Sequence, residues 1–238
     1  MIHIQNFDEF CKNKKDYINP NPLAPQHPYR ILICGPSSAG KTNLALNLVM
    51  KYTHWNKLYV VAKMVNAEDK YGMLKDWIKK MEHTLQEKTK IEDLQVGYFF
   101  DNFDALPPVD SLDDSIQNLV LIDDMITVHN QSKIEEYFIR SRKKNCSVIY
   151  LTQSFYKTPK LIRDNCSDFA IFDVGSKREL TEISKTIATR IPYEKFVTLF
   201  KECIEGEYGF MYISVRDKLM CKHIRKGMDG LFMENDSI

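Results

Sequence analysis

Short apolar runs alternate along the chain with segments in which apolar residues recur every three or four positions. The runs are typical of buried β-strands and lie at residues 31–34, 57–62, 119–122, 147–151 and 169–173. Helical spacing is found in residues 43–52, 71–81, 133–145, 176–187 and 192–204. Residues 82–117 are less regular and hold one short strand candidate at 96–100, and residues 208–213 alternate as a final strand. This order predicts an α/β domain with a central, mostly parallel sheet flanked by helices.

The two ends of the chain depart from this pattern. Residues 1–28 contain four prolines that favour an extended strap, which is either a linker or an arm packing on a neighbour. Residues 215–238 form a basic tail, either a solvated face or a DNA contact, whose cationic residues are Arg216, Lys218, Lys222, Arg225 and Lys226. The folded domain is therefore expected to span residues 29–214.

Composition limits the classes of function. The net charge of +1 over 238 residues excludes a strong overall basic field, so any nucleic-acid contact must come from local patches or from repetition around an oligomer. The six cysteines form no CxxC pair and the six histidines show no ligand spacing, which favours free thiols in a reducing compartment over disulfides or a structural metal. No apolar run is long enough to cross a membrane, so we expect a soluble, intracellular protein without membrane insertion.

The first chemical motif lies between the first strand and the first helix. It reads Gly35, Pro36, Ser37, Ser38, Ala39, Gly40, Lys41 and Thr42, which is a complete phosphate-binding P-loop. In such a loop successive backbone N–H groups surround a phosphate at the helix N-terminus, with Lys41 as the cation and Thr42 as an Mg²⁺ ligand. A chance match is disfavoured by the strand–loop–helix context. The motif predicts that the chain binds a nucleoside triphosphate with Mg²⁺.

Two acidic residues, Asp123 and Asp124, follow the strand at 119–122. Carboxylates at the end of a buried strand are costly unless a cation or hydrogen bonds compensate them. Beside a P-loop the natural cation is the Mg²⁺ of the nucleotide, which Asp123 would hold largely through water. Asp124 could then take a proton from the attacking water or orient it.

A third polar position, Gln153, follows the strand at 147–151. Ligands of open α/β sheets bind at the carboxyl ends of the strands, so Gln153 could reach the γ-phosphate or the attacking water. The alternative is a glutamine that caps a turn.

Two arginines, Arg140 and Arg142, lie at the end of the helix before that strand. Residues two apart on a helix point in nearly opposite directions, so both are not expected to serve one site. Either they are solvated cations favoured at a helix C-terminus, or one is an arginine finger for a neighbouring subunit's nucleotide.

Taken together, GPSSAGKT, LVLIDDM, FIRSRKKN and SVIYLTQS resemble the genome-packaging ATPases of poxviruses, a branch of the FtsK–HerA superfamily of DNA-pumping motors. The resemblance covers roughly residues 29–214 and extends to other large DNA viruses and virophages. It implies a RecA/ASCE-like sheet with the five core strands, numbered along the chain, in the order 5-1-4-3-2. It also implies ATP and Mg²⁺ as cofactors, and as partners double-stranded DNA, viral capsid proteins and further copies in a ring, a pentamer or hexamer. The location implied is the host cytoplasm or virus factory, with association with the virion as an option.

The same resemblance assigns roles to individual residues. Lys41 and Thr42 become the P-loop lysine and the Mg²⁺ ligand, and Asp123 becomes the Walker B acid. Asp124 takes the catalytic acid position, where members of the superfamily often carry the longer glutamate. Gln153 becomes the sensor, and Arg142 or Arg140 the finger.

The leading hypothesis is thus an ATPase that pumps double-stranded viral DNA into a preformed capsid. A small-molecule or nucleotide kinase is the second, since GPSSAGKT also resembles kinase P-loops, although kinases need an acceptor-binding insertion. A nucleotide-gated assembly switch and a related helicase or segregation motor are further alternatives. Stimulation of turnover by DNA or by a nucleoside monophosphate separates the first two, and negligible turnover would indicate the switch.

Overall fold

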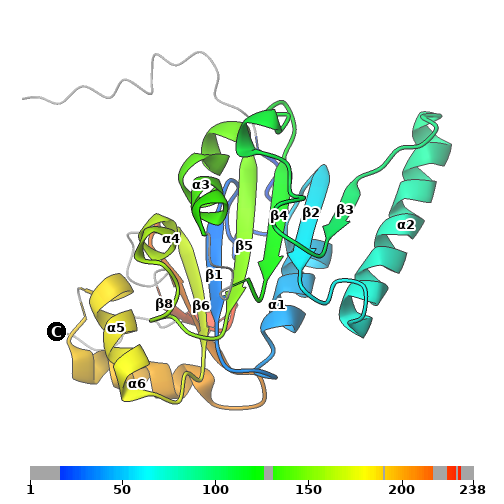
Figure 1. Cartoon of the computed structure of the whole chain (residues 1–238). Helices are drawn as coiled ribbons and strands as arrows, with labels where there is room; N and C mark the ends of the chain where they lie inside the picture. The colour runs from blue at the N-terminus through cyan, green and yellow to red at the C-terminus, as the bar shows by residue number, and fades with distance from the viewer. Residues whose placement is uncertain (1–16, 126–130, 190, 217–223, 229, 232–238) are drawn as a thin grey trace, which may run out of the picture.

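The computed structural model describes residues 17–125, 131–189, 191–216, 224–228, 230 and 231. Within these residues, one mixed sheet has the strand order β3-β2-β4-β5-β1-β6-β7-β8-β9 (Figure 1). The strands are β1 Arg30–Cys34, β2 Lys57–Ala62, β3 Gly97–Phe100, β4 Asn118–Asp123, β5 Cys146–Thr152, β6 Asp168–Phe172, β7 Phe210–Ser214, β8 Ile224–Lys226 and β9 Gly230–Leu231. The α-helices are α1 Lys41–Asn47, α2 Asp69–Thr89, α3 Ser132–Arg140, α4 Lys160–Asn165, α5 Lys177–Ile187 and α6 Tyr193–Ile204.

The predicted order of the core strands is confirmed. Counted along the chain, the five expected strands correspond to β1, β2, β4, β5 and β6, and they pair in the order β6-β1-β5-β4-β2, all parallel. The short strand candidate at residues 96–100 becomes β3, which adds a parallel edge strand beside β2. At the other edge β7, β8 and β9 add antiparallel strands, of which the sequence pattern predicted the first alone.

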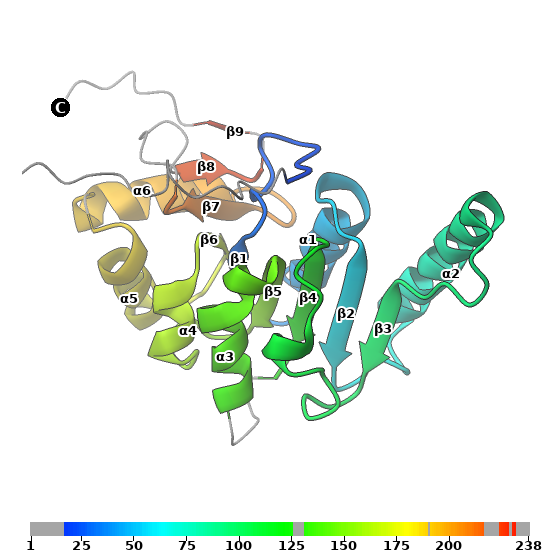
Figure 2. The same ribbon diagram turned by 90° about the horizontal axis from the view of Figure 1, so that it is seen from above.

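Helices cover both faces of the sheet (Figure 2). One apolar core lies under α1 and α2, and a second lies under α3, α4, α5 and α6. All seven residues of β5 are buried between these two cores. Strands that are buried on both faces need apolar residues at nearly every position, which is why the core strands appear in the sequence as continuous runs.

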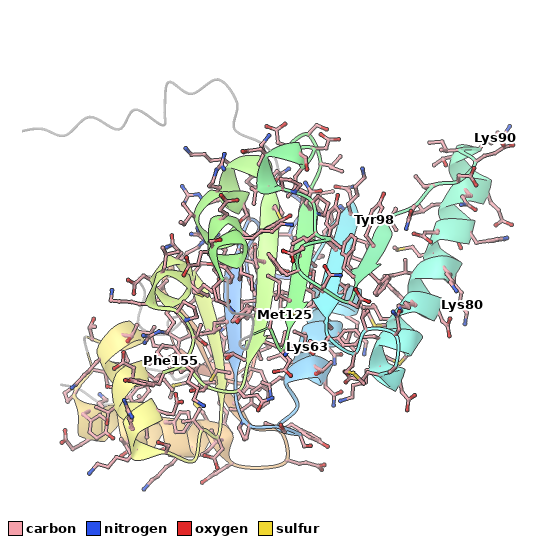
Figure 3. All side chains as sticks on the ribbon, in the orientation of Figure 1. Lys63, Lys80, Lys90, Tyr98, Met125 and Phe155 are labelled. Atoms are coloured by element: carbon pink, nitrogen blue, oxygen red, sulfur yellow. The ribbon has the colours of Figure 1, made fainter. Side chains whose placement is uncertain are left out.

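The long helix α2 covers the β3 edge of the sheet. Its residues Tyr71, Leu74 and Ile78 are buried, while Lys80 points outward (Figure 3). A Cβ on Gly97 of β3 would lie 2.7 Å from Cγ2 of Ile78, so the glycine permits this close packing.

The strap formed by residues 17–28 packs on the body of the same chain. Ala24 and His27 are both buried. The His27 ring bridges Oδ1 of Asn145 at 2.7 Å and Oγ of Ser147 at 2.8 Å. Burial lowers the pKa of His27 to about 4, so the imidazole is neutral at pH 7 and satisfies both partners without a buried charge.

The described part of the basic tail holds this strap in place. Arg216 donates to the carbonyl oxygens of Gln26 and Pro28. Arg225 is buried, donates to the carbonyl of Leu23 at 2.8 Å, and lies 4.1 Å from the centre of the Tyr212 ring. The expectation of a solvated or DNA-facing side chain is therefore wrong for Arg225.

Lys218 and Lys222, which belong to the same predicted patch, lie outside the described residues. In the parts of the chain that are described, none of the helices combines the length and hydrophobicity needed to span a bilayer.

Candidate active site

The carboxyl ends of β1, β5 and β4 meet at one edge of the sheet. Cys34 is in register with Thr152 of β5, and Leu151 of β5 is in register with Asp123 of β4. The N–H of Gly35 donates to the carbonyl of Thr152 at 3.2 Å, so the P-loop starts beside the residue that precedes Gln153. Figure 3 labels Met125, which follows Asp124, and Phe155, which lies two residues after Gln153. The structure therefore brings the P-loop, both aspartates and Gln153 together.

The P-loop has the backbone geometry of an anion cradle. Ser38 and Gly40 have left-handed conformations, with φ of 63° and 104°. Alternation of left- and right-handed residues turns successive N–H groups toward one centre. Within the described residues, the N–H groups of Ser38 and Gly40 donate to no acceptor. Lys41 bends back over the loop, and its Nζ donates to the carbonyl of Pro36 at 2.7 Å. This donor set fits a phosphate.

Both glycines of the loop are required by their surroundings. A Cβ on Gly35 would lie 2.6 Å from Cβ of Phe172 in β6. A Cβ on Gly40 would lie 2.8 Å from Cδ1 of Tyr208. The φ of 104° at this position would also strain any residue that has a side chain.

The carboxylate of Asp123 is held by a buried phenol. The hydroxyl of Tyr71, a fully buried side chain of α2, donates to Oδ2 of Asp123 at 2.5 Å. Burial, together with the neighbouring charge of Asp124, raises the pKa of Asp123, while the Tyr71 hydrogen bond and Lys41 oppose this rise.

Lys41 shares the same electrostatic environment. Burial lowers the pKa of its ammonium group, and the negative charges of Asp123 and Asp124 oppose that shift. The P-loop cation thus lies within the field of both aspartates. Burial also raises the pKa of Glu68, just before α2, and Asp123 raises it further, so a third carboxyl group lies near the site.

Asp124, the second aspartate, is hydrogen-bonded to Gln153. Asp124 has a left-handed backbone with φ of 52°, and both it and Gln153 are exposed. Nε2 of Gln153 donates to Oδ1 of Asp124 at 3.3 Å. One aspartate is therefore fixed inside the site, and the other is paired with Gln153 at its solvent side.

The two arginines lie at the other end of the strands, just before the amino end of β5. The turn between α3 and β5 is at the end of the sheet away from the β1–α1 loop (Figure 1). The seven residues of β5 span roughly 20 Å, so neither arginine reaches the P-loop of its own chain.

The two arginines differ in their partners. Nη2 of Arg140 lies 2.5 Å from both carboxylate oxygens of Asp110. Arg142 is exposed and has no ion pair or hydrogen bond among the described residues.

Two supporting residues were missed by the sequence analysis. Tyr71 belongs to the helical pattern of residues 71–81, and that spacing gives no sign of its hydrogen bond to Asp123. Glu179 lies three residues after Ser176, the spacing of a capping box, and Oγ of Ser176 accepts from its N–H at 3.4 Å. Its carboxylate, however, accepts from the hydroxyl of Ser154 and the N–H of Tyr156, and so anchors the loop after Gln153.

A P-loop strand and an acid-bearing strand separated by a third strand with a polar carboxyl end define a P-loop ATPase of the RecA-like type. The family described as Poxvirus A32 protein matches residues 20–228, and the chain belongs to this family. The resemblance to the poxvirus packaging ATPases is thereby confirmed.

Solved structures support the fold. The genome packaging NTPase B204 from Sulfolobus turreted icosahedral virus 2 in complex with AMP has a TM-score of 0.53 at 16% identity, covering 87% of this chain and 98% of that one. The AMPPCP complex has a TM-score of 0.54 at 16% identity and covers 83% and 95%. The ATP-gammaS complex has a TM-score of 0.51 at 15% identity, with the same coverage. No curated protein matches the chain.

We expect Asp124→Asn to retain ATP binding and to lower turnover by on the order of a hundredfold or more. The substitution keeps the size of the side chain and leaves Asp123 and Lys41 in place, but removes the charge beside Gln153. Steady-state hydrolysis and ATP titration measure the two effects, with Asp101→Asn at the end of β3 as a matched control. Loss of Mg²⁺-dependent ATP binding in Asp124→Asn would instead show that Asp124 holds the metal and that the two assignments must be reversed.

We expect Tyr71→Phe to raise the Mg²⁺ concentration for half-maximal hydrolysis by about ten- to a hundredfold. The phenyl ring still fills the core beneath α2, but the hydrogen bond that orients and stabilises the Asp123 carboxylate is lost. A thermal unfolding midpoint near that of the wild type would show that the fold is retained. An unchanged Mg²⁺ requirement would show that Asp123 does not depend on Tyr71.

Proposed function

We propose that the chain is an ATP-hydrolysing motor that translocates double-stranded viral DNA into a preformed capsid. Membership of the poxvirus A32 protein family supports this function. The main structural support for this function is the arrangement at the two ends of β5. Gln153 follows the strand beside the P-loop, and the exposed Arg142 lies in the turn before it. A single subunit therefore offers one complete hydrolytic edge and one arginine that only another subunit can use.

At the hydrolytic edge each residue has a separate task. Lys41 neutralises the β- and γ-phosphates that the loop surrounds, and Asp124 orients the attacking water or accepts its proton. Gln153 lies beside Asp124, where it can respond to the presence of the γ-phosphate.

Thr42 and Asp123 are the residues that would hold Mg²⁺, Asp123 largely through water. Within the described residues, no three His, Cys, Asp or Glu side chains are grouped as a metal site, and phosphate oxygens and water would complete the coordination. The ion neutralises charge on the phosphates when bound.

Arg142 is the better candidate for the finger. Arg140 is already paired with Asp110, whereas Arg142 has no partner among the described residues. In a ring of five or six copies, Arg142 of one subunit would approach the γ-phosphate bound by the next and stabilise the charge that develops during transfer. Hydrolysis in one subunit would then depend on its neighbour, so that the subunits hydrolyse ATP one after another.

The DNA contact is expected to be independent of sequence. A motor that passes every sequence should bind phosphates rather than base edges, which makes its binding sensitive to salt. The net charge of +1 per chain is small, but it is repeated around a ring. Capsid proteins would be the docking partners, in the host cytoplasm or virus factory, with retention in the virion as a further option.

We expect linear double-stranded DNA, and not a nucleoside monophosphate, to stimulate ATP hydrolysis. The stimulation should decrease as salt is raised, because phosphate contacts release counterions. Steady-state assays with each additive at several salt concentrations measure this. Stimulation by a monophosphate with phosphate transfer to it would establish the kinase alternative, and tight ATP binding without turnover would establish an assembly switch.

We expect Arg142→Ala to leave ATP binding nearly intact and to lower turnover by on the order of a thousandfold. Lys41→Ala should be inactive because its P-loop lacks the cation. Since a Lys41→Ala subunit still carries Arg142, mixing the two inactive variants should recover part of the hydrolysis. Lys143→Ala, an exposed cation of the same turn, is the matched control.

The mixing experiment requires proof that the two variants assemble together. With that proof, absence of recovery would contradict action between subunits. If Arg140→Ala carries the defect and Arg142→Ala does not, the finger is Arg140.

A further inference from the structure

A cavity of about 290 Å³ lies beside the P-loop, on the side away from the two aspartates. One wall is the face of α1 that begins at Gly40 and continues through Asn43, Leu44 and Asn47. These positions are three or four residues apart, so they line one side of the helix over roughly 10 Å. The cavity therefore runs from the phosphate cradle along α1.

The sheet order decides which part of a nucleotide could occupy this cavity. The P-loop follows β1; Asp124 and Gln153 follow β4 and β5 on one side of it, and Phe172 and Phe210 of the cavity belong to β6 and β7 on the other. A triphosphate with its γ-phosphate toward Asp124 and Gln153 must direct its nucleoside toward β6 and β7. That is the side of the cavity.

The cavity offers aromatic surface suited to a flat ring. The rings of Phe172 and Phe210 pack with their centres 5.0 Å apart. Tyr208, in the turn before β7, is 53% exposed and lies against Gly40. Its φ of 62° is left-handed, so the turn places a large exposed ring directly beside the phosphate cradle.

Amide groups supply polar contacts at the same wall. Nδ2 of Asn47 donates to the carbonyl of Asn43, while the Asn43 side chain makes no hydrogen bond to another described residue. An asparagine amide both donates and accepts, which matches the mixed donor and acceptor edge of a purine. An apolar pocket with a few polar groups is typical of small-molecule sites.

The opposite wall is formed by the strap and the tail, joined by a buried arginine. Nη1 of Arg225 donates to the carbonyls of Leu23 and Met228, both at 2.8 Å, and both residues line the cavity. On this side the cavity is therefore bounded by backbone that Arg225 holds in place.

We propose that this cavity binds the purine base of the nucleotide and that the ring of Tyr208 stacks on the base. The proposal rests on the proposed function, because it requires the P-loop to bind the triphosphate. It adds a specificity determinant in the turn before β7 and gives the N-terminal strap a direct part in nucleotide binding.

The test compares ATP with inorganic tripolyphosphate, which has the phosphates but no base. By calorimetric titration, Tyr208→Ala should bind ATP about tenfold or more weakly, the effect of losing one base–aromatic stack, and should bind tripolyphosphate as the wild type does. Tyr208→Phe keeps the ring and should bind ATP normally. Met73→Ala, with the same exposed fraction on the outside of α2, is the matched control.

Unchanged ATP affinity in Tyr208→Ala would overturn the proposal. An equal loss of ATP and tripolyphosphate affinity would also overturn it, because Tyr208 would then support the P-loop rather than the base. Lys41→Ala should weaken both ligands, so a failure of the P-loop assignment would appear in that variant and not in the difference between ligands.

Discussion

The parallel pairing of β4, β5 and β1 is the constraint on which the rest of the molecule depends. It places the ends of three strands at one level, so that the P-loop, Asp123 and Gln153 lie together although they are far apart in the sequence. A slip of one residue in β5 would move Gln153 by about 3.3 Å and turn its buried side chains to the wrong face. The apolar burial of β5 on both faces opposes such a slip.

Charge balance is the second constraint at this edge. Asp123 is half-buried beside Asp124, and the Tyr71 hydroxyl and the Lys41 ammonium compensate its charge. Isolated buried charges of this kind would destabilise the fold. The same side chains thus stabilise the folded state and arrange the site. Tyr71 does both, because its ring packs in the core while its hydroxyl donates to the Asp123 carboxylate.

The core strands, and the positions of the P-loop, the two aspartates and Gln153 at their carboxyl ends, could be predicted from the sequence because each depends on neighbouring residues. Apolar runs reveal strands that are buried on both faces, and the P-loop is continuous. The bonds from Tyr71 to Asp123 and from Glu179 to Ser154 could not, since they join polar side chains 52 and 25 residues apart and leave no periodic pattern. Arg225 was misjudged because its charge suggests solvent, whereas backbone carbonyls and the Tyr212 ring enclose it. β8 and β9, of three and two residues, are too short to show alternation.

β5 also has a mechanical consequence. It is hydrogen-bonded to β1 and β4 along its length, with Gln153 just beyond one end and the Arg142 turn at the other. A strand held on both sides does not stretch, so it behaves as a short rod whose two ends move together. In the ring that we propose, a displacement at one nucleotide would therefore reach the neighbouring subunit as a rotation of the whole sheet, and not as a change of shape within it.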